Sequence, residues 1–160
     1  MRSLPFPQRW STATFVAHRS SMRFTTQHVE AASTLRANTL VEHLDIRFGV
    51  DGDGRLQASM PVDERTHQPM GLLHGGATAA LAETLGSVGS ALLIDLRTQA
   101  TVGMEITANH LRGVKEGRVT ATGELVHQGN KTHVWDIRVH DEAGRFIAIC
   151  RLTNMIIDRR

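Results

Sequence analysis

The sequence has 160 residues and a mass of 17.6 kDa, which suits one domain and leaves little room for two. Hydrophobic residues make up 41% and charged residues 21%, so a folded core is feasible and wholesale disorder is disfavoured. The net charge of +2 and the pI near 9.3 would, taken alone, indicate a nucleic-acid or membrane-surface partner.

The basic excess lies in the N-terminal segment. Residues 1–23 carry four of the 18 basic side chains and no acidic one, so the rest has 14 basic and 16 acidic side chains. An Arg- and Ser/Thr-rich leader is typical of an organellar presequence; an unstructured tail, or translation from a start upstream of Met22, is the alternative. We expect a disordered leader at 1–24, a domain at 25–160, and neither a nucleic-acid nor a membrane partner. The expected location is the cytoplasm, with organellar import left open.

Cysteine and histidine usage argues against a metal or redox site. Cys150 is the only cysteine and cannot form an intrachain disulfide, and the nine histidines are scattered singly. No apolar run approaches the roughly 20 residues of a membrane-spanning helix. We therefore expect no metal, no cofactor and no membrane span.

The first elements are a helix and a hairpin. Residues 25–40 are predicted to form an amphipathic helix, into whose apolar face Arg36 also projects. That face holds Val29, Ala32, Leu35 and Leu40. Residues 44–50 and 55–62 alternate like strands around the turn Asp51-Gly52-Asp53-Gly54.

A loop over 63–73 leads into a long helix from 74 to about 94. Four strand-like segments follow at 101–112, 118–128, 133–140 and 145–157, separated by turn residues, and they are predicted to form a meander. Long antiparallel strands and one largely buried helix indicate an α+β domain with a sheet wrapped on the helix.

The central helix carries two chemically informative features. Glu83 is the only ionisable residue between His74 and Asp95, and carboxylates held among apolar residues commonly serve as general bases. The alternative is a glutamate that reaches solvent at the helix edge. Ser87, four residues on, shares its face and could orient a water, or simply pack.

The start of the same helix could hold an oxyanion. His74-Gly75-Gly76 opens it, and free N–H groups at a helix N-terminus stabilise negative charge, while glycine allows a carbonyl to approach closely. Gly75 and Glu83 are eight positions apart, or roughly 12 Å along a helix. One chain cannot easily place both on one small carbonyl. Two antiparallel copies could, so a dimer is expected if both residues act.

Three segments make the sequence resemble the hotdog-fold acyl-CoA thioesterases. They are MPVDERTHQPMGLLHGGATAALAE at 60–83, VGMEITANHLRGVKEGRV at 102–119 and HVWDIRVHDEAGRFIAICRLT at 133–153, within a resemblance that covers about residues 35–157. The sequence is most similar to bacterial thioesterases for aromatic acyl groups, notably the 1,4-dihydroxy-2-naphthoyl-CoA hydrolases of menaquinone synthesis and the proofreading thioesterases of aryl siderophore synthesis. The resemblance implies a hotdog fold, assembled as a dimer of dimers, that hydrolyses acyl-CoA.

The resemblance also implies roles for individual residues. Glu83 matches the catalytic carboxylate, as nucleophile or general base, and Gly75 the backbone donor to the thioester oxygen. Gln68 and His74 match side chains that orient the thioester, and Ser87 the residue near the attacking water. The segments thought to contact CoA contain His110, Arg112, Asn130 and Lys131.

Proteins with this fold can have functions other than thioester hydrolysis. A non-catalytic hotdog sensor could bind acyl-CoA without needing Glu83. A hotdog dehydratase or hydratase would need another acid/base arrangement. A serine hydrolase finds no support, because Gly86-Ser87-Val88-Gly89 is not a G-x-S-x-G motif.

Overall fold

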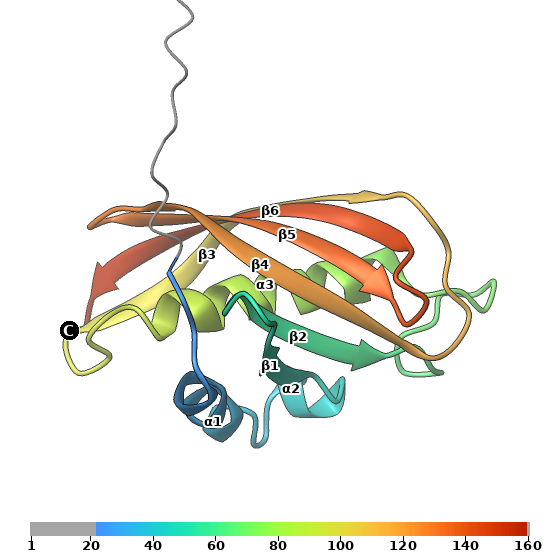
Figure 1. Ribbon diagram of the computed structural model, residues 1–160, viewed down its shortest axis with the longest axis horizontal. Coiled ribbons are helices and arrows are strands. Elements are labelled where there is room, and N and C mark those ends of the chain that lie inside the picture. Colours follow the sequence, from blue (N-terminus) through green and yellow to red (C-terminus); the bar gives the residue numbers. More distant parts are fainter. Residues whose placement is uncertain (1–21, 160) are drawn as a thin grey trace, which may run out of the picture.

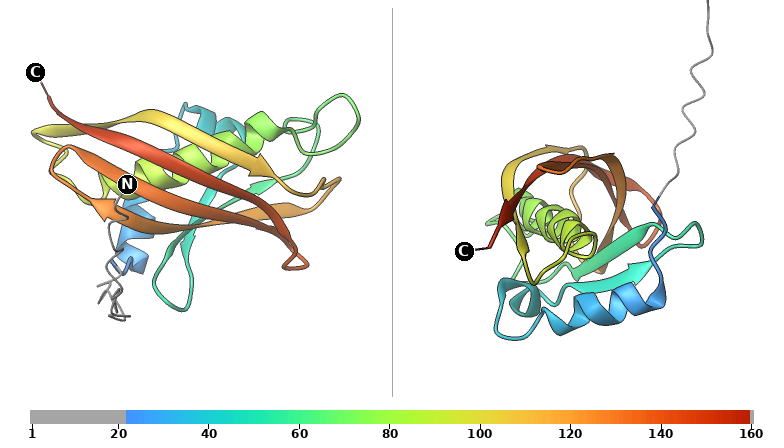
Figure 2. Two further views of the ribbon diagram at one scale, coloured as in Figure 1. Left: turned by 90° about the horizontal axis from the view of Figure 1, so that it is seen from above. Right: turned by 90° about the vertical axis from the view of Figure 1, so that its left-hand side faces the viewer.

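The computed structural model describes residues 22–159, in which a curved antiparallel sheet wraps around one long helix (Figures 1 and 2). The elements are α1 (Thr26–Thr34), α2 (Leu40–His43), β1 (Arg47–Val50), β2 (Leu56–Pro61), α3 (Gly75–Ala91), β3 (Gln99–His110), β4 (Arg118–Gln128), β5 (Thr132–Asp141) and β6 (Phe146–Asp158). The predicted α+β class is confirmed. Most of the predicted leader, residues 1–21, lies outside the described residues.

Glycines on α3 let the sheet approach the helix closely. A Cβ built at Gly86 would lie 2.5 Å from Leu152 Cδ2, and one at Gly89 would lie 2.7 Å from the Trp135 ring. Trp135 is fully buried at the centre of the core, together with Leu85 of α3. The loss of helix propensity at these two glycines, roughly 1 kcal/mol each, is therefore offset by close packing.

The predicted four-strand meander is wrong for β3. The sheet order is β1-β2-β4-β5-β6-β3, so only β4, β5 and β6 form a meander. Strand β2 pairs with the outer edge of β4, from Gln57 opposite Thr122 to Pro61 opposite Arg118. That edge is unavailable to β3, which crosses to β6 and forms the other edge of the sheet.

The predicted helix at 25–40 is also too long. It ends at Thr34, and a turn with Asn38 at φ 60° precedes the short α2. Ala32 is buried as expected, but Leu35 and Leu40 are 46% and 58% exposed because they fall at the end of α1 and beyond it. Arg36 pairs with Asp45 at 3.2 Å from a half-buried position.

Phe24 belongs to the packed part of the chain. Its N–H donates to Gly54 O at 2.7 Å, and its ring lies 6.1 Å from that of Trp135. The segment before α1 is thereby fixed to the hairpin between β1 and β2.

Candidate active site

His74 caps α3 with its own side chain. The Gly76 N–H donates to His74 Nδ1 at 2.8 Å. An accepting Nδ1 carries no proton, so the ring proton of neutral His74 is on Nε2. The ring therefore presents an N–H donor on its outer side, beside the first turn of the helix.

Gly75 offers a free backbone donor in a close-fitting position. Its N–H has no acceptor in the described part of the chain, as expected for the first helical residue. A Cβ built at Gly75 would lie 2.9 Å from His110 Nε2. Because Gly75 has no side chain, the His110 ring can pack directly against the first turn of the helix.

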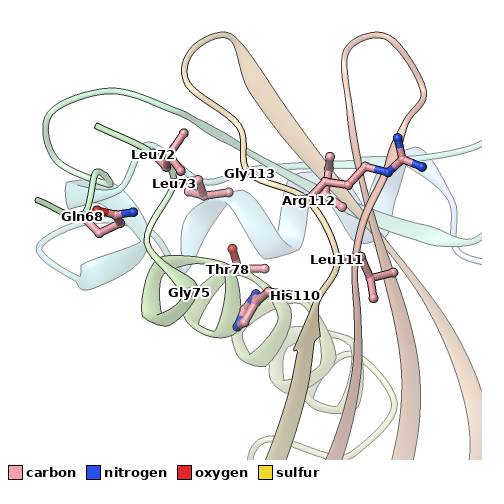
Figure 3. A pocket seen from close by; sticks show the side chains of 10 residues that line it. Gln68, Leu72, Leu73, Gly75, Thr78, His110, Leu111, Arg112 and Gly113 are labelled. Atoms are coloured by element: carbon pink, nitrogen blue, oxygen red, sulfur yellow. The ribbon is translucent and has the colours of Figure 1, made fainter. Parts of the chain in front are cut away.

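A cavity of about 360 Å³ opens in front of this N-terminus (Figure 3). It is lined by Gln68, Leu72, Leu73, Gly75, Thr78, His110, Leu111, Arg112, Gly113 and Ile147. The Gln68 amide oxygen accepts from the Met70 N–H, which leaves its NH₂ group as the available donor. The cavity therefore gathers four predicted site residues, Gln68, Gly75, His110 and Arg112, and its remaining wall is mainly apolar.

Glu83 lines a different cavity. This space of about 220 Å³ is bordered by Glu83, Gly103, Met104, Glu105, Ile106 and Leu152. Glu83 is half-buried, and Ser87 Oγ donates to its Oε1 at 2.7 Å. Gly103 allows this arrangement, because a Cβ there would lie 3.0 Å from the same carboxylate oxygen. The predicted proximity of Ser87 to Glu83 is confirmed.

The two cavities share no lining residue. Between them, α3 is continuous from Gly75 to Ala91, so the backbones of Gly75 and Glu83 stay roughly 12 Å apart. A single chain thus carries the free Gly75 N–H and the Glu83 carboxylate in two separate cavities.

Asn130 and Lys131 lie far from the first cavity. They occupy the exposed turn between β4 and β5, where Lys131 O accepts from the Ile156 N–H at 2.9 Å. Along β6, the position opposite Thr132 is Met155, whereas that opposite His110 is Ala148. Seven residues of strand separate the two levels, or roughly 24 Å. One chain therefore does not bring the predicted CoA-contacting residues together.

Sequence reasoning missed a buried polar chain behind Glu83. Asn154 is fully buried, and its Nδ2 donates to Gly86 O at 3.1 Å and to Ser90 Oγ at 3.0 Å. The Asn154 Oδ1 lies 3.2 Å from Ser87 Oγ, and Trp135 Nε1 donates to Ser90 Oγ at 2.9 Å. One signal was available: Asn154 falls on the inward face of β6, and the other residues of that face are apolar.

Neither a metal cluster nor a membrane helix is present in residues 22–159. This part of the chain has no group of three or more His, Cys, Asp or Glu residues arranged to hold a metal ion. None of its helices is long and apolar enough to cross a membrane.

Comparison with known proteins identifies the family. Residues 70–148 match the model of the thioesterase superfamily. The chain is 46% identical over 129 residues to 1,4-dihydroxy-2-naphthoyl-CoA hydrolase of Escherichia coli, covering 81% of this chain and 94% of that one. It is equally similar to the proofreading thioesterase EntH of Cronobacter turicensis, at 46% identity with 81% and 93% covered.

Solved structures agree with the sequence comparison. A crystal structure of a mutant of thioesterase PA1618 from Pseudomonas aeruginosa superposes with a TM-score of 0.78 at 47% identity, covering 82% of this chain and 94% of that one. The chain belongs to the thioesterase superfamily, and it is a thioester hydrolase with the hotdog fold.

Proposed function

We propose that this chain hydrolyses acyl-CoA thioesters with aromatic acyl groups, in active sites that two copies share. The observation that carries the proposal is the separation of the free Gly75 N–H and the Ser87-bound Glu83 into two cavities of one chain. A thioester needs both groups at one carbonyl, and an antiparallel second copy supplies the missing half.

The edge strand β3 offers the surface for this pairing. It forms the free edge of the sheet, it is 12 residues long, and Met104 on it is 58% exposed. Long, partly apolar edges invite pairing with another strand. Pairing of β3 with its copy brings the partner close to Gly103, which borders Glu83. A dimer is the minimal active unit, and further association gives the dimer of dimers.

The proposed reaction begins with polarisation of the thioester carbonyl. The Gly75 N–H donates to the carbonyl oxygen, helped by the Gln68 NH₂ group and by Nε2–H of His74. In one route Glu83 removes a proton from water, the water oxygen bonds to the carbonyl carbon, and the C–S bond breaks to release thiolate. In the other, Glu83 itself attacks and the thiolate leaves, after which water hydrolyses the mixed anhydride. A thiol of pKa near 8.5 leaves without a strong acid in either route.

The substrate class is supported by the relatives and by the charges around the cavities. The two relatives at 46% identity belong to the thioesterases for aromatic acyl groups that the sequence resembles. The leading candidate substrate is therefore 1,4-dihydroxy-2-naphthoyl-CoA, a menaquinone precursor. Arg112 and His110 of one copy, with Asn130 and Lys131, are proposed to contact the CoA phosphates. The cytoplasm is the proposed location.

A thiol-release assay tests the function. Wild-type protein and the variants Glu83→Ala and Glu83→Gln are compared on a panel of aroyl-CoA and aliphatic acyl-CoA thioesters. We expect aroyl-CoA to be preferred, and kcat to fall about 10²–10⁴-fold in both variants, the range for loss of a positioned acid–base group. Activity that survives both substitutions would disprove the role of Glu83.

The same panel separates the hydrolase from a sensor. A sensor would bind acyl-CoA tightly, measured by calorimetry, and release no thiol from any thioester. Preference for aliphatic substrates would instead retain the hydrolase and overturn the aromatic specificity.

A further inference from the structure

Five hydrogen-bonded side chains form a polar chain from Trp135 in β5 through Ser90, Asn154 and Ser87 to Glu83 in α3. Trp135 Nε1 and Asn154 Nδ2 both donate to Ser90 Oγ, at 2.9 and 3.0 Å. Ser90 and Asn154 are fully buried beside the apolar core residues Trp135 and Leu152. Buried polar groups are costly unless they are hydrogen-bonded, and the hydrogen bonds of this chain satisfy its buried members.

The Asn154 amide has only one possible orientation. The Gly86 carbonyl, 3.1 Å away, can only accept, so the NH₂ end of Asn154 must face it. The opposite end, Oδ1, therefore faces Ser87 Oγ at 3.2 Å. Asn154 is an acceptor towards Ser87, and the packing of β6 against α3 holds it there.

Ser87 thus has one hydroxyl proton and two acceptors. Glu83 Oε1 is 2.7 Å from Ser87 Oγ, and Asn154 Oδ1 is 3.2 Å from it on the other side. An ionised carboxylate is the stronger acceptor, so the proton points to Glu83 in the resting protein. During the reaction Glu83 loses its negative charge, whether it takes a proton from water or forms an acyl bond. Asn154 Oδ1 is then the better acceptor.

We propose that Asn154 is a positioning residue, whose Oδ1 accepts the hydrogen bond of the Ser87 hydroxyl whenever Glu83 becomes neutral. This inference rests on the proposed function of Glu83. When the hydroxyl rotates towards Asn154, its lone pairs turn towards Glu83 and the adjacent water, where they accept a hydrogen bond from either one. No covalent bond changes at Asn154 or at Ser87. The effect is to keep Ser87 correctly bonded in both charge states of Glu83.

A double-mutant cycle tests this role on the full chain. The variants are Asn154→Leu, Ser87→Ala and the two combined, assayed for kcat and KM on the best aroyl-CoA substrate. Losing one hydrogen bond in the transition state corresponds to about a tenfold fall in kcat for Asn154→Leu, with KM nearly unchanged. In the Ser87→Ala background the same substitution should have no further effect, because Asn154 acts only through Ser87.

A conservative variant controls for disturbed folding. Asn154→Asp keeps an acceptor oxygen at the Oδ1 position and exchanges only the NH₂ group, so it should lose less kcat than Asn154→Leu. Full kcat in Asn154→Leu, or an equal loss with and without Ser87, would overturn the inference while leaving the proposed function intact. A wild-type protein that hydrolyses no thioester would overturn both.

Discussion

Gly75 and Glu83 lie on one unbroken helix, yet they line separate cavities of the same chain. Helix α3 crosses the concave side of the sheet (Figure 2), so its N-terminus and its middle meet different parts of β3. His110, at the end of β3, lies against Gly75, and Gly103, nearer its start, lies against Glu83. In the proposed dimer, an antiparallel copy of β3 would exchange these two levels and would bring Gly75 of one copy towards Glu83 of the other.

Mixed dimers should therefore regain activity from two inactive chains. Gly75→Pro removes the oxyanion donor, at a cost of about 10²–10³-fold in kcat, and proline is tolerated at the first helical position. Glu83→Ala removes the carboxylate. In a random mixture roughly half of the dimers are mixed and each has one intact site, so about a quarter of wild-type activity should return.

The control for this experiment is Gly75→Ala. It adds the same Cβ near His110 but keeps the N–H, so it should retain more activity than Gly75→Pro. If dimers are verified to contain one chain of each variant and still show no activity, the proposal that two chains share each active site is contradicted.

Gly89→Ala should destabilise the protein, although alanine favours helices. The new Cβ would lie 2.7 Å from the buried Trp135 ring, which cannot move away. Overpacking costs about 1–3 kcal/mol, against roughly 1 kcal/mol gained in helix propensity. We expect a net loss of about 1 kcal/mol in urea denaturation. Gly49→Ala, in strand β1 where nothing lies within 4 Å of the added Cβ, is the control for adding a methyl group without a clash and should not destabilise. Equal stability of the two variants would contradict close packing at Gly89.

Local patterns predicted α3 and the last four strands to within a few residues at each end, because hydrophobic period and glycine turns are properties of short segments. The position of β3 in the sheet could not be predicted from the sequence of that segment alone. It depended on β2 occupying the edge of β4. The same holds for Asn154, whose partners Gly86 and Ser90 are more than 60 residues away in sequence. The separation of Gly75 from Glu83 could be expected because both residues lie on one helix of known rise.

His133 should make the fold sensitive to acid. Burial, with a smaller effect of His127, lowers the pKa of His133 below its usual 6.5, and Nδ1 has no partner within the described chain. Below about pH 6.5 the unfolded chain binds a proton that the folded chain does not, so the free energy of unfolding falls as pH falls. Wild type should lose stability as the pH falls through about 6.5 and below, and His133→Leu should lose less. An identical loss in both proteins, measured by urea denaturation, would refute this assignment.

Cys150 should be unreactive until the protein unfolds. The side chain is 2% exposed, and burial raises the pKa of its thiol from 9.0 to about 11, which lowers the thiolate fraction near neutral pH by about 100-fold. Since this is the only cysteine, the native chain should react slowly with a disulfide reagent and should release one equivalent after denaturation. The measurement is the absorbance of the released thiol with and without guanidinium. Rapid stoichiometric labelling of the native protein would show that β6 opens readily, and would also mean that thiol-release assays need correction for the enzyme's own cysteine.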